Sequence, residues 1–200
     1  MGKLTGSGKL YAEEYIRLGL LAKGRKILIV NAAVGGTGFK RKHWGRGEIL
    51  SERLYEMLEL ATSEPQNKMI AFLWHQGEHD VFENLGVPQE ELYARYKTSL
   101  KEFFQTVRVR YGDVPVIAAG FSEQYRTQNE EYRKGCDTVS RVTREVFSAI
   151  GNAAFIETQD LRSNDQVSGN GDIVHFCRES LYELGHRYFE KFLALQEKKE

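Results

Sequence analysis

Three short segments of the chain concentrate the residue types that enzymes use for acyl transfer. Residues 33–39 read AVGGTGF, residues 74–80 read WHQGEHD, and residues 171–176 read GDIVHF. Glycine turns and glutamine amides supply N–H groups that stabilise a developing oxyanion, and a histidine beside a carboxylate can act as a general base. The three segments therefore predict the parts of an acyl-transfer site.

Each segment has both a functional and a structural interpretation. Gln76 can donate its amide N–H to an oxyanion and Glu78 can orient a histidine, or this segment can be a buried hydrogen-bond network that fixes its loop. His175 can accept a proton from a nucleophile while Asp172 fixes its tautomer, or it can be a loop histidine near a helix N-terminus. The glycines either point N–H groups at a ligand or form a tight turn. We favour function for the glutamine segment, because polar clusters at the strand ends of α/β sheets are usually sites.

Two other patterns imitate known ligand sites. Residues 6–10 (GSGKL) and 35–40 (GGTGFK) resemble phosphate loops, but neither has a Ser or Thr where a phosphate loop holds magnesium. His75 and His79 lie four residues apart, yet a glutamine follows the first histidine where the zinc-protease motif has a glutamate. We therefore expect neither a nucleotide site nor a metal site.

The elements that must position these segments alternate along the chain. Apolar periodicity and turn residues predict helices at residues 10–22, 48–61, 88–110, 129–150 and 179–195. Apolar runs predict strands at residues 26–33, 68–75, 114–120 and 153–157. Strands separated by helices predict a parallel sheet in a three-layer α/β/α sandwich. Because ligands bind beyond the carboxyl ends of such strands, the three segments should meet there.

Length and composition narrow the class of protein. A chain of 200 residues is expected to form a single domain, residues 1–200. Lys plus Arg and Asp plus Glu number 28 each, and this balance argues against a nucleic-acid partner. No apolar stretch approaches the ~18 residues of a membrane span, and no signal peptide is visible, so we expect a cytoplasmic protein without a membrane partner. The two cysteines form no disulfide framework.

The three motifs in this order resemble the SGNH-hydrolase superfamily, whose sheet is flavodoxin-like. Within it, the sequence is similar to the sialate O-acetylesterase and acetylxylan esterase group, carbohydrate esterase family 6. The resemblance covers roughly residues 6 to 195. It implies that a serine attacks an acetyl ester on a sugar, without a cofactor. The expected partner is an acetylated carbohydrate or a small ester.

The resemblance also assigns roles to residues of this chain. It implies that His175 is the base, supported by Asp172 or by Glu78, and that a backbone N–H near Gly35 or Gly36 contributes to the oxyanion hole. The Gln76 side chain would replace the asparagine of other SGNH enzymes. The positions that match the motifs are Gly35, Gly36, Thr37, Gln76, Gly77, Glu78, Asp172 and His175.

The sequence departs from this family at the nucleophile. The family begins with a strand that ends in a Gly-x-Ser-Asn turn and lies centrally in the sheet, and this chain displays neither. Relative to the family, the chain is expected to be N-terminally truncated and to lack the first strand, with Ser7 a poor substitute for the nucleophile. We expect weak or no ester hydrolysis and marginal stability, or a homodimer that pairs through the gap.

Two further functions stay open at this point. One is a non-catalytic glycan-binding or interaction relative that keeps the pocket. The other is a small-molecule binder unrelated to ester chemistry.

Overall fold

The centre of the fold is a sheet of three parallel strands in the part of the chain that the structure describes. This structure is a computed structural model, and it describes residues 6–81 and 88–198. The strands are β1 (Phe72–Trp74), β2 (Val116–Ala119) and β3 (Ala153–Ile156), in the order β1-β2-β3. Trp74 pairs with Ala118, and Ala118 pairs with Phe155, so the three strands end at nearly the same level. The strands predicted at residues 68–75, 114–120 and 153–157 are thus confirmed.

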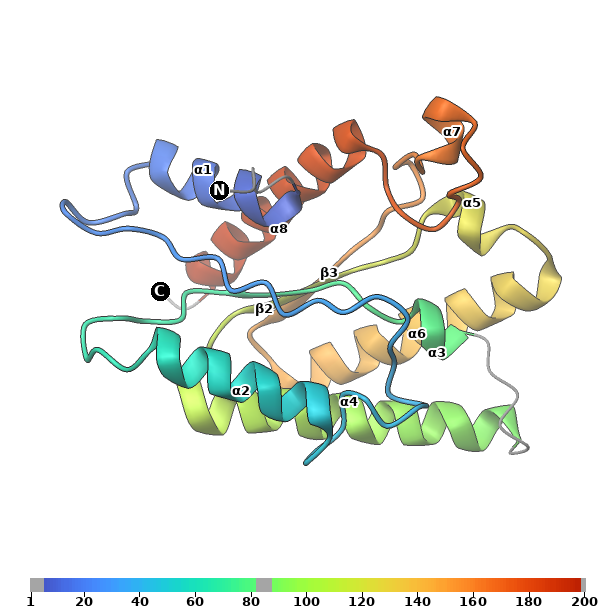
Figure 1. The fold of residues 1–200 in the computed structure, drawn as a ribbon, viewed down its shortest axis with the longest axis horizontal. Helices are drawn as coiled ribbons and strands as arrows, with labels where there is room; N and C mark the ends of the chain where they lie inside the picture. Colours follow the sequence, from blue (N-terminus) through green and yellow to red (C-terminus); the bar gives the residue numbers. More distant parts are fainter. Residues whose placement is uncertain (1–5, 82–87, 199–200) are drawn as a thin grey trace.

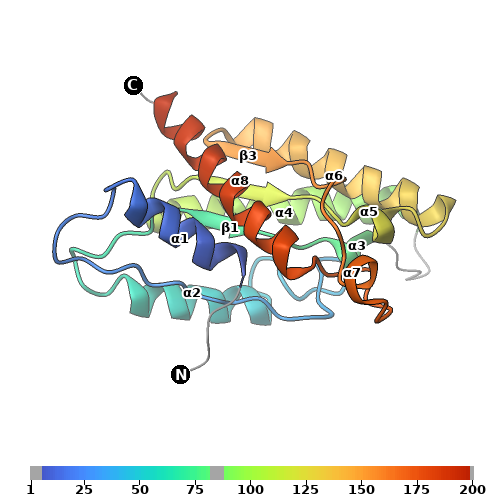
Figure 2. The same cartoon turned by 90° about the horizontal axis from the view of Figure 1, so that it is seen from above.

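Helices cover both faces of this sheet (Figure 1). One face carries α1 (Ser7–Arg17) and α8 (Arg178–Glu197), and the other carries α2 (Ile49–Ala61), α4 (Gln89–Tyr111) and α6 (Glu130–Ile150). Figure 2 shows α8 crossing over the strands. Three short helices are α3 (Glu78–Val81), α5 (Glu123–Arg126) and α7 (Asp165–Ser168). This arrangement confirms the predicted α/β fold with a parallel sheet. No described helix has the length and apolarity needed to cross a membrane.

Local sequence explains where the two longest helices of the α2 face begin and end. The Asn129 side chain caps α6 by accepting hydrogen bonds from the N–H groups of Glu131 and Tyr132, each at 3.0 Å. Helix α4 follows Pro88 and ends at Gly112, whose φ of 85° suits a residue without a side chain. Both helices bury one apolar stripe against the sheet, so packing sets their orientation.

A cluster of aromatic side chains fills the core between the sheet and the α2 face. Phe103 is fully buried at its centre. Its ring centroid lies 5.2 Å from that of Trp74 and 5.0 Å from that of Phe104. Phe39 also contacts Phe103, at 6.0 Å, so the core reaches the glycine segment. Such ring contacts stabilise the fold beyond the area that they bury.

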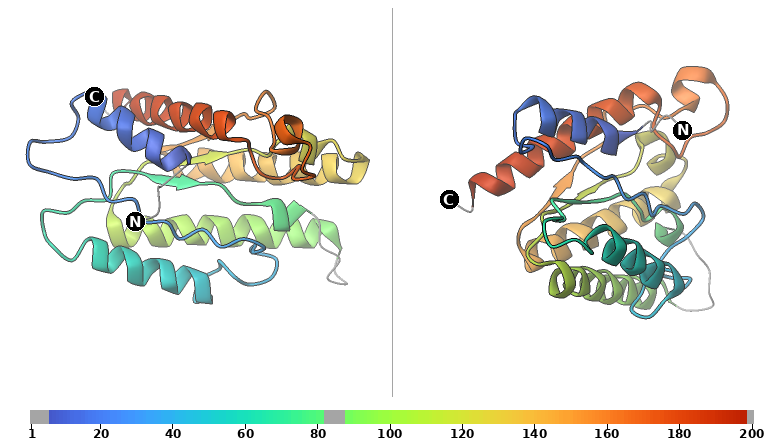
Figure 3. Two further views of the ribbon diagram at one scale, coloured as in Figure 1. Left: turned by 45° about the horizontal axis from the view of Figure 1, so that its top comes forward. Right: turned by 60° about the vertical axis from the view of Figure 1, so that its left-hand side comes forward.

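The strand predicted at residues 26–33 is wrong, because these residues pair with none of the described strands. Within the described ranges, residues 26–34 make no backbone–backbone hydrogen bond. The segment belongs to the long connection between α1 and α2 (Figure 3). Its apolar residues pack in two directions: Ile29 lies close to Gly8 of α1, and Val30 and Ala32 pack on the aromatic core. An apolar run in a sequence indicates that its side chains are buried. A strand also needs a neighbouring strand with which its backbone forms hydrogen bonds.

Candidate active site

The segments that follow the strands meet at the carboxyl edge of the sheet, as predicted. His75, just after β1, lies with its Nε2 3.1 Å from the carbonyl oxygen of Gly120, just after β2. Thr158, after β3, donates its hydroxyl to the carbonyl of Phe121 at 2.7 Å. These contacts tie the three strand ends together, where ligands bind in parallel α/β sheets.

His175 and Asp172 form the pair expected of a general base and its orienting acid. His175 Nδ1 lies 2.9 Å from Asp172 Oδ1, and the His175 N–H donates to the same oxygen at 3.1 Å. The His175 side chain is 77% exposed, and no described residue is hydrogen-bonded to its Nε2. Glu78 instead lies 3.6 Å from His75. Of the two carboxylates left open by the sequence, the structure therefore pairs Asp172 with His175.

Hydrogen bonds hold the loop that carries this pair. Asn164 donates its backbone N–H to the carbonyl of His175 at 2.9 Å, and its side-chain amide donates to Asp172 Oδ2 at 2.8 Å. Phe176, next to His175, stacks on the His75 ring with centroids 5.4 Å apart. This stacking brings the histidine loop against the glutamine segment, so two of the three motifs are in direct contact.

The Asp172 pair gives a testable pH dependence. Burial raises the pKa of Asp172, but hydrogen bonds from Asn164 and His175 lower it more, so the pKa lies below its ordinary value. A carboxyl of this kind stabilises the fold above its unfolded pKa of about 3.9, and this stabilisation is lost as pH falls through the folded value. We expect Asp172→Asn to lower the free energy of unfolding at neutral pH and progressively less below about pH 4. Urea denaturation at several pH values measures this, and a pH-independent difference would contradict it.

Gln76 is held by the protein through both hydrogens of its amide. Its Nε2 donates to the carbonyl of Thr37 at 3.1 Å and to Asp80 Oδ2 at 2.8 Å. Its Oε1 is buried and has no hydrogen-bond partner among the described residues. The geometry therefore agrees with the hydrogen-bond network that was the structural interpretation of this segment. The oxyanion role of Gln76 stays a prediction, and it requires one of these two bonds to open.

The glycine segment has N–H groups with no hydrogen-bond acceptor in the part of the chain that the structure describes. The backbone N–H groups of Gly35, Gly36 and Thr37 make no hydrogen bond to any residue within 6–81 or 88–198. Gly36 has a φ of 74°, a conformation that favours glycine. A Cβ added there would lie 3.9 Å from His79 Nε2, so the turn lies against the segment that follows β1. These free amides are the part of the site that best fits an oxyanion hole.

Two site features were not predicted from the sequence. In the sequence Asp80 is only the last residue of the second segment, whereas in the structure its carboxylate accepts hydrogen bonds from the glycine segment and from Gln76. His43, which lies outside the three segments, accepts the N–H of Gly38 at its Nδ1 at 3.1 Å. The sequence contains one signal for the contact between Asp80 and Gln76. The two residues lie four apart beside the start of α3, a spacing at which side chains can meet.

Ser7 lies in the packing between α1 and α8. A Cβ added at Gly185, in the middle of α8, would lie 2.7 Å from the carbonyl oxygen of Ser7. No described hydroxyl is hydrogen-bonded to the His175 ring, and the Ser122 hydroxyl, which contacts the histidine loop, donates to the carbonyl of Ile173 at 2.5 Å. Among the described residues, the structure thus gives the base no serine partner.

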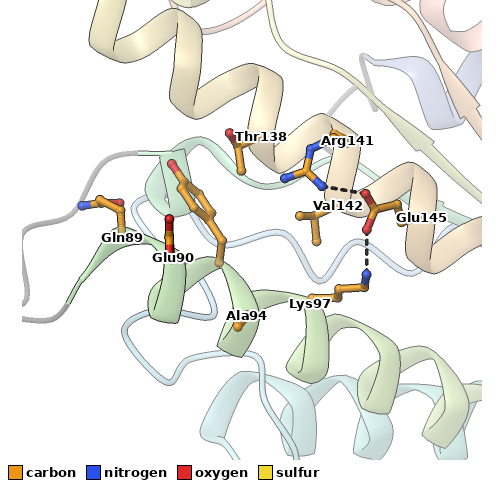
Figure 4. A pocket seen from close by; sticks show the side chains of 9 residues that line it. Gln89, Glu90, Ala94, Lys97, Thr138, Arg141, Val142 and Glu145 are labelled. Carbon is orange, nitrogen blue, oxygen red and sulfur yellow. Dashed lines mark hydrogen bonds and ion pairs between the residues drawn. The ribbon is translucent and has the colours of Figure 1, made fainter.

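A surface hollow between α4 and α6 offers no alternative site (Figure 4). Its two cationic side chains, Lys97 and Arg141, both pair with Glu145 at 2.6 Å. The hollow shares no lining residue with the three motifs. The carboxyl edge of the sheet therefore remains the candidate active site.

Comparison with known proteins decides the family. Residues 3–194 match the family model described as carbohydrate esterase, sialic acid-specific acetylesterase. The chain belongs to this family. The crystal structure of NanS has the same fold, with a TM-score of 0.65 and 15% sequence identity over 94% of this chain and 70% of that one. A search of curated proteins finds no match. The esterase family suggested by the three motifs is thereby confirmed.

Proposed function

We propose that the chain is a carbohydrate O-acetyl esterase-like protein and that its site takes acetyl esters of sugars. The observation that carries this proposal is the His175–Asp172 pair, which leaves Nε2 without a partner among the described residues. The unbonded amides of Gly35 and Gly36 supply the complementary half of an acyl-transfer site. The family description supports O-acetylated sialic acid as the first substrate class to test.

The mechanism follows from these positions. Given a serine nucleophile, which no described residue supplies beside His175, the serine would attack the acetyl carbonyl while His175 accepts its hydroxyl proton at Nε2 and Asp172 stabilises the resulting imidazolium. The Gly35 and Gly36 N–H groups stabilise the oxyanion, and His175 returns the proton to the departing sugar oxygen. Water then releases acetate by the same sequence. Because no described serine contacts His175, we propose that the chain as it stands performs this reaction weakly.

Binding can be tested separately from turnover. We expect O-acetylated sialic acid to shift the NMR signals of the Gly35 and Gly36 amides and of the His175 ring, because the proposal places the acetyl group against these amides and Nε2. The matched control is the same sugar without its acetyl group, which should shift them less. Acetate released above background should disappear in His175→Ala. Equal shifts with both sugars, or none at these residues, would contradict the proposed substrate class.

One observation favours a second function, a non-catalytic glycan-binding relative. Both hydrogens of Gln76 Nε2 are engaged within the protein, and no described hydroxyl faces His175. A binding protein would show the acetyl-dependent shifts but no acetate release, even after a strand carrying a Gly-x-Ser-Asn turn is added. An esterase would gain turnover from that addition.

A further inference from the structure

Asp80 is a buried carboxylate at the point where the glycine segment meets the glutamine segment. The residue is 0% exposed. Its Oδ1 accepts the N–H of Lys40 at 2.7 Å, and its Oδ2 accepts the N–H of Phe39 at 3.1 Å and the amide of Gln76 at 2.8 Å. Three donors from two distant segments thus converge on one side chain, and they partly replace the water lost on burial.

These bonds divide the glycine segment into an anchored half and a free half. The N–H groups of Phe39 and Lys40 are bound by Asp80, and that of Gly38 is bound by His43. The N–H groups of Gly35, Gly36 and Thr37 have no acceptor among the described residues. Gln76, itself held by Asp80, binds the carbonyl of Thr37 at the boundary between the two halves. The orientation of the free amides therefore depends on the anchor.

We propose that Asp80 is a positioning residue of the site, whose carboxylate fixes the Gly38–Lys40 backbone and Gln76 and thereby presents the Gly35 and Gly36 N–H groups to a ligand. The inference rests on the proposed function only in taking this ligand to be an acyl oxyanion.

The chemistry of the contact requires an aspartate and a neighbouring glycine. A carboxylate only accepts hydrogen bonds, so it suits three donors, whereas an asparagine would turn an NH₂ group toward one of them. A Cβ added at Gly38 would lie 2.8 Å from Asp80 Oδ2, so any side chain there would displace the carboxylate. An aspartate one residue away along α3 would not reach both segments, because successive helical residues face different directions.

The groups around Asp80 act on its pKa in opposite directions. Burial raises the pKa of Asp80, and the hydrogen bonds from Lys40, Gln76 and Phe39 act in the opposite direction. The Lys40 ammonium lies 4.3 Å above the ring of Tyr93, and its charge also favours the ionised carboxylate. Breaking the three bonds would leave three N–H donors without an acceptor in a largely buried place, which is unfavourable.

The test compares Asp80→Asn with Asp113→Asn in the isotope-labelled full chain. Asp113 is exposed and precedes β2, at the opposite edge of the sheet, so it serves as a matched control. In Asp80→Asn we expect the Phe39 and Lys40 amides to exchange with solvent at least tenfold faster. We also expect the Gly35 and Gly36 signals to shift and broaden. Asp113→Asn should leave all four signals unchanged.

A merely structural role for Asp80 would give a different result. It would lower the melting temperature and leave the Gly35 and Gly36 signals in place, and that outcome would overturn the proposal. Should Asp80→Asn fail to fold, Gly38→Ala provides the second variant, because its added methyl group crowds the carboxylate without removing it. The same four signals should respond, and an unchanged set would also overturn the proposal.

A version of the chain that turns over acetyl esters allows a kinetic test. There, Asp80→Asn should lower kcat on the order of 10- to 100-fold with KM nearly unchanged, because the amides bind the oxyanion in the transition state. An equal rise in KM instead would contradict the positioning role. If no version turns over esters, the proposed function fails while the NMR comparison still decides the role of Asp80.

Discussion

Acetate release from a chromogenic acetate ester by the 200-residue chain should be on the order of a millionfold slower than by a version carrying a strand that ends in Gly-x-Ser-Asn. This factor is the loss seen when serine hydrolases lose the nucleophile, and the structure gives the His175 ring no hydroxyl partner among the described residues. Water activated by His175 would account for the remaining rate. Initial rates at pH 7 for the two versions measure the ratio.

Ser7→Ala serves as the control for this experiment. Ser7 packs against α8 at Gly185, so its replacement should leave the slow rate of the short chain unchanged. Robust turnover by the short chain that disappears in Ser7→Ala would make Ser7 the nucleophile and overturn the proposal.

The largest effect on stability is expected at Phe103. Phe103→Ala should lower the free energy of unfolding by about 3–5 kcal/mol, because it removes a fully buried ring and leaves a cavity in the aromatic core. Urea denaturation followed by tryptophan fluorescence measures this loss, since Trp44 and Trp74 both contact Phe103. Val109→Ala, on the same helix and 87% exposed in the wild type, is the matched control and should change stability little.

A second substitution keeps this prediction testable in a chain of low stability. Phe103→Leu retains most of the apolar volume and should cost less than the alanine variant. A loss below about 1 kcal/mol for Phe103→Ala would show that the core repacks around the site.

The sequence predicted the five longer helices and the three paired strands because their signals are local, whereas it did not predict the short helices α3, α5 and α7. Asn129 precedes α6 and Pro88 precedes α4. Both residue types mark the start of a helix, and they can be recognised from the sequence alone. Residues 26–33 have the apolar character of a strand, but the hydrogen-bonding partner of a strand comes from elsewhere in the chain. The residues of the segment themselves do not show whether that partner strand is present.

The same distinction applies to the site. The His175–Asp172 pair was predictable because the two residues lie three apart in one loop. The engagement of Gln76 was not, because it depends on Thr37 and on the orientation that Asp80 imposes on the amide. Which carboxylate serves His175 was likewise undecided until the structure placed Glu78 beside His75.

The unpaired segment at residues 26–34 has a consequence for the colloidal behaviour of the protein. Its side chains Ile27 to Val30 form a short apolar run of high β-propensity, and Leu28 is 70% exposed. Such a run with free backbone groups is a template for intermolecular cross-β pairing. Arg25 and Lys26 stand directly before it, and like charges stacked in register repel each other. We therefore expect these two cations to oppose such pairing and, because salt screens their repulsion, to oppose it less as ionic strength rises.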